Sequence, residues 1–175
     1  DYRLNYIEDL KEFSSDVYRE ISSDREKMEI GYLNSMKEKG NGAKEWSEIL
    51  YNECVANHKK DVFRLATSSG PHKDDLSITL SGMDARSYGS QGQQRSCALS
   101  LKLSEASILK KYSGEQPIAL LDDVMSELDE GRQTFILNYL DNWQVFITCC
   151  DPSQLLRSKK GKAFEVIDGE IKEME

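Results

Sequence analysis

The chain has 175 residues, which is enough for one ordinary domain or two small lobes with a buried core. Hydrophobic residues make up 38% of it and charged residues 31%, which fits a soluble globular protein and argues against a disordered or membrane-embedded one. The formal net charge is −8, which excludes a surface that is basic all over. No basic segment followed by an apolar run opens the sequence, so we expect a cytoplasmic protein without membrane contact.

The cysteines are too scattered for a zinc site, and adjacent cysteines rarely form a disulfide with each other. They are Cys54, Cys97, Cys149 and Cys150. We expect reduced thiols that are mostly buried.

Hydrophobic spacing in the first part of the chain predicts two helices with a strand between them. Residues 3–21 carry apolar side chains at steps of three and four, the pattern of an amphipathic helix. Residues 28–32 alternate as a short strand does, and the glycines of residues 37–44 predict a loop. A second helix is expected over residues 45–65. The apolar side chains expected on one face of each helix are Tyr6, Leu10, Phe13, Val17 and Ile21, and then Trp46, Ile49, Leu50 and Cys54.

The middle of the chain predicts a hairpin, a long helix and a buried strand. Residues 76–80 alternate and end at Ser81-Gly82, which suits a hairpin turn. Residues 94–112 have a broad apolar stripe with no Gly or Pro and predict a helix. The continuous apolar run at residues 118–121 is typical of a strand buried on both faces.

The last part continues the alternation of helices and strands. A helix is expected around residues 135–140, and a second apolar strand over residues 144–148. A terminal hairpin is expected over residues 164–172 with its turn at Asp168-Gly169. Helices alternating with apolar strands predict an α/β protein with an α+β mixture of elements.

Two aspartates follow the apolar strand at residues 118–121, in the form of a Walker B motif. Magnesium prefers hard oxygen ligands, and nucleotide sites in α/β sheets lie at the carboxyl edge of the strands. Asp122 is placed to hold Mg²⁺ directly or through water, and Asp123 to orient the attacking water. On their own, two aspartates after a strand are as often a turn or a helix cap.

The sequence SQGQQ at residues 90–94 precedes the long helix. A Ser and a Gly at a helix start offer a hydroxyl and an accessible N–H near the positive end of the helix dipole, which suits a phosphate group. The alternative is an ordinary N-cap, in which Ser90 or Gln91 binds the first free amides.

The order of these motifs resembles that of the second half of ABC-type ATPase heads. Three blocks carry a more specific resemblance, to the RecF family, and the likeness runs from about Met28 to Thr148. The blocks are SGPHKDDL at residues 69–76, YGSQGQQRSCALSLKLSEA at 88–106 and PIALLDDVMSELDEGRQ at 117–133.

The resemblance implies an ABC-ATPase head fragment in which a helical signature lobe is joined to part of the nucleotide-binding sheet. Residues 1–115 would form helical lobe II with arm helices and the signature. Residues 116–175 would form the C-terminal part of ATPase lobe I. The full-length protein would be an ABC-type ATPase, and this part alone would be inactive.

The resemblance also assigns roles to individual residues. The ABC signature, which contacts the γ-phosphate of ATP held by the opposite subunit, corresponds to Ser90, Gln91, Gly92 and Gln93. The Walker B pair corresponds to Asp122 and Asp123, the first of which would bind Mg²⁺. The D-loop that crosses the dimer interface corresponds to Ser126, Glu127, Leu128 and Asp129.

Several residues in these blocks also have structural explanations. Asp129 suits a helix N-cap, and Arg95 and Lys102 either relay the state of the signature or face solvent. A structural hydrogen bond explains His72 better than catalysis does. The role of the GPHKDD sequence does not follow from its residues. After the strand at 144–148 many ABC ATPases carry a γ-phosphate-sensing histidine, which is replaced here by TCCD, so slow ATP turnover is expected.

No Walker A sequence G-x-x-x-x-G-K-[ST] occurs in the chain. We therefore expect this sequence to be a fragment with Walker A upstream. The strands at 118–121 and 144–148 would then belong to a sheet whose other strands are absent, and their apolar faces would need another chain.

The function implied is that of a bacterial, nucleoid-associated DNA repair, recombination and replication protein of the SOS response. It would form an ATP-dependent homodimer on double-stranded DNA near single-strand junctions, and with RecR and RecO it would help to load RecA at gaps. The alternatives are a non-enzymatic docking lobe and the head of another SMC-like ATPase, although residues 3–65 hold too few heptads for a long coiled coil. A basic cluster is either a DNA-backbone contact or a solvated loop, and consists of Arg157, Lys159, Lys160 and Lys162.

Overall fold

The computed structural model describes residues 2–36, 43–150 and 161–174. It divides into two compact units, Asp1–Ile108 and Leu109–Glu175. The boundary between them falls inside the long helix α4 (Gln91–Ser113). In the part of the chain that the structure describes, none of the helices is both long enough and apolar enough to cross a membrane.

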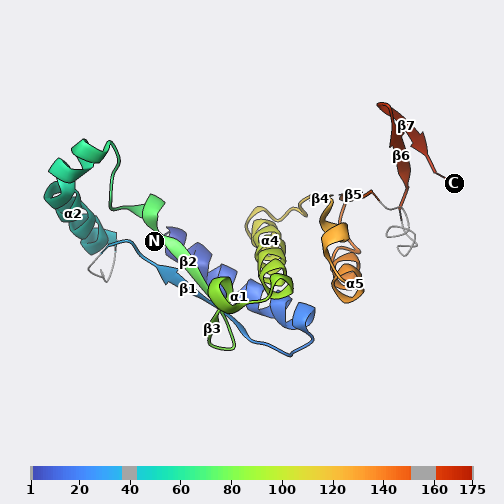
Figure 1. Cartoon of the computed structure of the whole chain (residues 1–175), viewed down its shortest axis with the longest axis horizontal. Helices are drawn as coiled ribbons and strands as arrows, with labels where there is room; N and C mark the ends of the chain where they lie inside the picture. The colour runs from blue at the N-terminus through green and yellow to red at the C-terminus, as the bar shows by residue number, and fades with distance from the viewer. Residues whose placement is uncertain (1, 37–42, 151–160, 175) are drawn as a thin grey trace. The chain divides into compact units, whose positions relative to one another are not determined.

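The first unit is built on an antiparallel sheet of order β1-β2-β3 (Figure 1). β1 (Met28–Leu33) pairs with β2 (Asp75–Leu80), from Met28 opposite Leu80 to Leu33 opposite Asp75. β2 turns at Ser81-Gly82 into the short β3 (Met83–Asp84). Both residues of this turn have positive φ, a conformation that glycine adopts without strain. The predicted hairpin is therefore confirmed.

The helix α1 (Tyr2–Ser22) packs against β1, as the amphipathic pattern of its sequence predicts. Leu10, Val17 and Ile21 are buried as predicted, whereas Tyr6 is 37% exposed and the buried face extends to Ile7 and Ser14 instead. Ser14 is small enough to be fully buried, and its hydroxyl lies 3.5 Å from the carbonyl oxygen of Lys11. The apolar core of this unit consists of Leu10, Tyr18, Met28, Ile30, Leu80, Ala85, Cys97 and Ile108.

The helix α2 (Ala43–Arg64) lies between β1 and β2 in the sequence and confirms the second predicted helix. Its expected apolar face, which includes Trp46 and Leu50, is half-buried rather than buried. Residues 37–42, most of the predicted loop before it, lie outside the described residues.

After the one-turn helix α3 (Ala85–Tyr88), the chain enters α4. The helix starts three residues earlier than its apolar pattern predicts. Ser96, Ser100 and Ser104 are buried along it at steps of four, and each hydroxyl donates to the carbonyl four residues earlier at 2.6–2.9 Å. These bonds satisfy polar groups that would otherwise be costly to bury.

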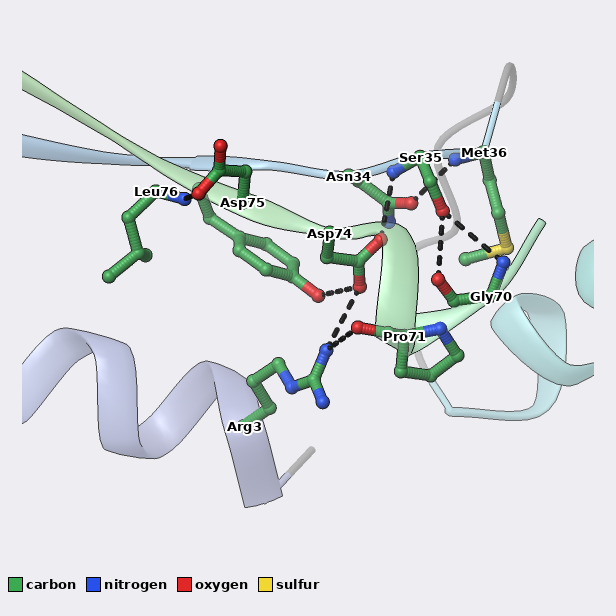
Figure 2. A network of polar contacts seen from close by, with 10 residues as sticks. Arg3, Asn34, Ser35, Met36, Gly70, Pro71, Asp74, Asp75 and Leu76 are labelled. Atoms are coloured by element: carbon green, nitrogen blue, oxygen red, sulfur yellow. Dashed lines mark hydrogen bonds and ion pairs between the residues drawn. The ribbon is translucent and has the colours of Figure 1, made fainter. Parts of the chain in front are cut away.

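A polar network joins the start of α1 to the segment before β2 (Figure 2). The carboxylate of Asp74 accepts hydrogen bonds from the Tyr32 hydroxyl, from the backbone N–H of Ser35 at 2.8 Å and from the Arg3 guanidinium at 3.2 Å. Arg3 also donates to the carbonyl of Pro71 at 2.6 Å. The Asp74 side chain is only 5% exposed, so these donors replace the water that burial removes.

The same network explains a sequence block whose role the residues alone did not reveal. The 3₁₀ turn η1 (Pro71–Lys73) leads into Asp74, and the Ser35 hydroxyl donates to the Gly70 carbonyl at 3.1 Å. The ring nitrogen of His72 lies 3.2 Å from the carbonyl of Thr67, which confirms a structural hydrogen bond. Most of the GPHKDD block therefore fixes the point where the chain returns from α2 to the sheet.

The second unit contains two parallel strands joined through a helix. β4 (Ala119–Asp122) pairs with β5 (Val145–Thr148), and the connection passes through the 3₁₀ turn η2 (Val124–Glu127) and α5 (Glu130–Tyr139). Leu120 is 74% exposed and Phe146 is 57% exposed. The apolar run at residues 118–121 is typical of a strand buried on both faces, but a sheet of two strands leaves one of its faces uncovered within the described residues. This exposure agrees with the expectation that the apolar faces of the two strands need another chain.

The terminal hairpin is confirmed as β6 (Phe164–Ile167) and β7 (Glu170–Glu173). Asp168 and Gly169 both have positive φ, as the two-residue turn requires. Both strands are exposed along their whole length.

None of the four cysteines forms a disulfide, as expected, but only Cys97 is buried. Burial, together with the charge of Glu26, raises the pKa of Cys97 to about 11. The expectation of mostly buried thiols is wrong because Cys54 lies on the half-buried α2, and because Cys149 and Cys150 follow the last residue of β5.

The buried carboxylate of Asp74 gives a test of the first unit. Burial alone would raise the pKa of Asp74, but hydrogen bonds from Tyr32 and Ser35 and the charge of Arg3 hold it below its ordinary value. Asp74→Asn should lower the local stability of the β1–β2 pair by about 2 kcal/mol at neutral pH. In hydrogen exchange followed by mass spectrometry, amides of these strands should exchange about 30-fold faster.

Asp75→Asn is the matched control, because the neighbouring aspartate is exposed. A depressed folded-state pKa contributes stability above the ordinary Asp value of about 3.9, and this contribution is lost as the pH falls through the folded value. The difference between the wild type and Asp74→Asn should therefore shrink below about pH 4. Equal exchange in the Asp74 and Asp75 variants at neutral pH would show that the network does not hold these strands.

Candidate nucleotide site

The start of α4 is closed by a reciprocal pair of hydrogen bonds. The Ser90 hydroxyl accepts from the backbone N–H of Gln93 at 3.3 Å, and the Gln93 side-chain carbonyl accepts from the backbone N–H of Ser90 at 2.7 Å. This arrangement is a capping box, with Ser at the cap position and Gln three residues later. The predicted N-cap is confirmed, and it does not conflict with a role in binding phosphate.

The Gln93 side chain is also held from outside its own helix. Its amide NH₂ donates to the Glu26 carboxylate at 2.5 Å, and the buried Tyr18 hydroxyl donates to the other oxygen of Glu26 at 2.7 Å. The amide orientation is unambiguous because Glu26 is an acceptor and the Ser90 N–H is a donor. The core of the first unit therefore fixes the side chain of Gln93.

This geometry leaves a surface that suits an anion. Gln91 and Gly92 occupy the first helical positions, where backbone N–H groups have no carbonyl partner within the helix. Ser90 and Gln91 are exposed. A phosphate placed there would meet N–H donors, a hydroxyl and the positive end of the helix dipole.

The second cluster lies at the carboxyl end of β4. Asp122 is in register with Thr148, the last residue of β5, and the Thr148 hydroxyl donates to Asp122 Oδ1 at 2.6 Å. The backbone N–H of Asp123 donates to the Thr148 hydroxyl at 3.1 Å and lies 3.2 Å from the Thr148 carbonyl oxygen. Asp123 has φ 51°, in the left-handed region, so the chain leaves the strand abruptly at this residue.

The donor set at this edge fits Mg²⁺. Asp122 is exposed, and the Thr148 hydroxyl binds only one of its two oxygens. Magnesium is usually held by one or two carboxylates together with water and substrate phosphates, not by a cage of protein ligands. Among residues 2–36, 43–150 and 161–174, no cluster of three or more His, Cys, Asp and Glu side chains is arranged to hold a metal.

The segment after β4 is braced locally. The Ser126 hydroxyl donates to the Asp123 carbonyl at 2.8 Å, and the side-chain amide of Gln133 donates to the carbonyls of Met125 and Leu128 at 2.8 and 3.1 Å. Asp129 caps α5 by accepting from the backbone N–H of Arg132 at 3.0 Å, which confirms the predicted N-cap.

The predicted site residues thus form two groups. Residues 90–93 lie together at the start of α4 in the first unit. In the second unit Asp122 ends β4, and residues 123 and 126–129 follow it. Lys102 pairs with Glu105 at 2.8 Å on the exposed side of α4, which favours the solvent-facing interpretation. In the basic cluster, Lys162 pairs with Glu173 at 2.8 Å, while residues 157, 159 and 160 lie outside the described residues.

Sequence reasoning missed Glu26 and Thr148, whose side chains bind those of Gln93 and Asp122. Glu26 lies 67 positions from Gln93, in a turn with no motif of its own. Thr148 ends an apolar strand, where a β-branched residue is expected for strand formation alone. Both contacts follow from the way β1 pairs with β2 and β4 pairs with β5. Local sequence patterns do not reveal which strands pair or in which register.

No family model matches the chain, but curated relatives do. The chain is 41% identical over 171 residues to the DNA replication and repair protein RecF of Clostridium perfringens, which covers 97% of this chain and 46% of the relative. It is 40% identical over 173 residues to the RecF protein of Clostridium acetobutylicum, covering 98% and 47%. The chain therefore spans about half the length of the curated relatives it matches.

Solved structures agree with this similarity. A structure of the recombination mediator protein RecF with ATPrS in the RecFOR pathway matches with a TM-score of 0.83 and 42% identity, over 99% of this chain and 46% of that one. The corresponding structure with ATP matches with a TM-score of 0.79 and 40% identity, over 99% and 46%.

A third solved structure comes from work on the ATP-driven dimerization of SMC ATPases. It matches with a TM-score of 0.58 at 13% identity, over 99% of this chain and 86% of that one, and it supports the fold alone. These matches confirm the predicted fold class, a mixture of helices and strands found in ABC-ATPase heads. By sequence and by structure, the chain belongs to the RecF family, and it corresponds to about half of a family member.

Proposed function

We propose that the full-length protein containing this chain is an ATP-dependent DNA-binding repair protein that dimerises when it binds ATP. The observation that carries the proposal is the match, at 42% identity over 99% of the chain, to RecF with a bound ATP analogue. The capping box at Ser90 and the carboxylates at the carboxyl end of β4 support it, because they offer hydrogen-bond donors for a phosphate group and a ligand for a metal.

In this proposal each ATP is shared between two subunits. Residues 90–93 would contact the γ-phosphate of ATP bound to the opposite subunit, and residues 126–129 would cross the interface as the D-loop. Asp122 would hold Mg²⁺ and Asp123 would orient the attacking water. Bound Mg²⁺ would neutralise charge on the β- and γ-phosphates. The two-part arrangement would separate a helical lobe over residues 1–115 from residues 116–175 of the nucleotide-binding lobe.

The partners we propose are double-stranded DNA near single-strand junctions and the proteins RecR and RecO, with RecA loading at gaps as the outcome. The solved RecF structures belong to the RecFOR pathway, which supports the two protein partners. We place the protein in the bacterial cytoplasm with the nucleoid. The acidic net charge of −8 implies that DNA binds to a local patch or to elements outside this chain.

Two alternatives make different predictions. A docking lobe without enzymatic function would leave ATP hydrolysis of the full-length protein unaffected by changes at Asp122. The head of another SMC-like ATPase is disfavoured, because identity to the SMC structure is 13% compared with 41% to RecF.

The chain alone should neither bind ATP with useful affinity nor hydrolyse it, because it carries no Walker A loop to cradle the β- and γ-phosphates. Calorimetry with the isolated 175-residue chain checks this. Micromolar binding of ATP would mean that the phosphate site is complete within these residues.

Asp122→Asn in the full-length protein removes one charge from the proposed metal site and keeps the shape of the side chain. Steady-state ATP turnover should fall at least about tenfold, equivalent to about 1.4 kcal/mol in the barrier. Asp168→Asn is the control, since it removes the same charge at an exposed turn where Asn tolerates the positive φ. Turnover within a factor of about two of wild type would make Asp122 a turn residue.

Ser90→Arg separates a phosphate contact from a helix cap. Loss of the cap alone should cost about 1 kcal/mol of stability and leave ATP-driven dimerisation intact. If Ser90 meets a phosphate across the interface, the variant should still bind ATP but remain monomeric in light scattering with ATP, and it should lose ATP-dependent retention on DNA.

Ser47→Arg, which adds the same side chain at an exposed position of α2, is the control. If the Ser90 variant dimerises at the same ATP concentrations as the wild type, SQGQQ is an ordinary helix start and not a phosphate contact.

A further inference from the structure

The Thr148 side chain links Asp122, the last residue of β4, to Asp123, the first residue after it. Its hydroxyl donates to Asp122 Oδ1 at 2.6 Å and accepts from the backbone N–H of Asp123 at 3.1 Å. Parallel pairing puts Thr148 directly opposite Asp122, at the end of the neighbouring strand. One hydroxyl therefore contacts both residues of the proposed catalytic pair.

The direction of these bonds is fixed by chemistry. A carboxylate has no hydrogen to give, and a backbone N–H has no lone pair to offer, so the single hydroxyl hydrogen must point to Asp122. A hydrogen bond to a charged acceptor is stronger than one between neutral groups. This bond restrains rotation of the Asp122 carboxylate and leaves Oδ2 available to another ligand.

The same side chain restrains the turn out of the strand. Asp123 adopts φ 51°, a conformation that is uncommon for residues other than glycine. Its N–H lies within hydrogen-bonding distance of both the hydroxyl and the carbonyl of Thr148. Thr148 thus stabilises the backbone that determines where the Asp123 side chain starts.

We propose that Thr148 is a positioning residue for the two carboxylates. It orients Asp122 toward the metal and holds Asp123 at the start of the turn, without itself contacting ATP. This inference rests on the proposed function of Asp122. Groups that orient metal ligands typically change metal affinity by about 10- to 100-fold when they are removed.

A simpler explanation is that threonine only favours the strand conformation of β5. Valine has the same shape and an equal or higher preference for strands. If strand formation were the reason for threonine, Thr148→Val would be neutral or stabilising. If the hydroxyl is the reason, valine should be harmful, and serine, which keeps the hydroxyl and loses the methyl group, should be tolerated.

The test compares Thr148→Val, Thr148→Ser and the control Thr134→Val in the full-length protein. Thr134 is an exposed residue of α5 whose hydroxyl donates to the Glu130 carbonyl at 2.8 Å, so its substitution removes a similar hydrogen bond outside the site. One readout is the Mg²⁺ concentration that gives half-maximal ATP hydrolysis. The second needs no turnover: it is the affinity for a non-hydrolysable ATP analogue in Mg²⁺ relative to that in EDTA, measured by calorimetry.

Thr148→Val should raise the half-maximal Mg²⁺ concentration about tenfold and reduce the Mg²⁺-dependent gain in affinity by a similar factor. Its affinity in EDTA should be unchanged. Thr148→Ser and Thr134→Val should stay within about twofold of wild type in both readouts.

Wild-type Mg²⁺ dependence in Thr148→Val would overturn the proposal, and so would equal losses in the Val and Ser variants, which would point to the methyl group and not the hydroxyl. Asp122→Asn, measured alongside, distinguishes failure of the role of Thr148 from failure of the proposed metal site. If Asp122→Asn loses the Mg²⁺ effect and Thr148→Val keeps it, only the role of Thr148 is wrong. If Asp122→Asn keeps it, the proposed metal site fails and the role of Thr148 fails with it.

Discussion

The antiparallel pairing of β1 with β2 determines most of the first unit. It joins residues more than forty positions apart, and the segment between the two strands contains α2. At one end Leu33 lies opposite Asp75, which brings Ser35 and Tyr32 to the carboxylate of Asp74. At the other end, Met28 opposite Leu80 brings the segment before β1 close to the start of α4.

One register therefore creates both polar networks of this unit. A shift by a single residue would turn Met28 and Ile30 out of the core, so the apolar face of β1 and the networks at its two ends require the same pairing. The hydrogen bond between Glu26 and Gln93 depends on this register, although neither residue lies in β1 or β2. The apolar core of the first unit thus controls the geometry of a polar helix start.

In the second unit, strand pairing again brings the site residues together, but here the two strands are parallel. Residues at the carboxyl ends of β4 and β5 come together because parallel strands end at the same edge, and this places Thr148 beside Asp122. A parallel sheet is normally covered on both faces, whereas Leu120 and Phe146 are exposed here. Since the chain spans 46% of its relatives, we expect the remaining part of a family member to supply the neighbouring strands and the Walker A loop.

The sequence predicted the elements well because each has a clear local pattern. The spacing of Leu10, Val17 and Ile21 predicted α1, and Asp168-Gly169 predicted the terminal turn. The burial of Ser14 in place of Tyr6 could not be predicted, since it depends on how closely other elements approach this side of α1.

The candidate site was predicted in a similar, partial way. Motifs identified Ser90 and Asp122 but not Glu26 or Thr148, whose contacts depend on strand register. The structural role of GPHKDD depends on the burial of Asp74 next to Arg3, which lies 71 positions earlier in the sequence. Local patterns therefore indicate the residues that we propose to face a ligand, and tertiary structure identifies the neighbouring residues that contact them.

We propose that each ATP-binding site is completed by Asp122 of one subunit and Ser90 of the other. The most direct measurement is ATP hydrolysis by an equimolar mixture of two full-length variants, Ser90→Ala and Asp122→Asn. If the residues act across the interface, a mixed dimer contains one intact site, and the mixture should hydrolyse ATP faster than either variant alone. If they act within one subunit, no dimer in the mixture has an intact site, and a rate no higher than the mean of the two variants would contradict the claim.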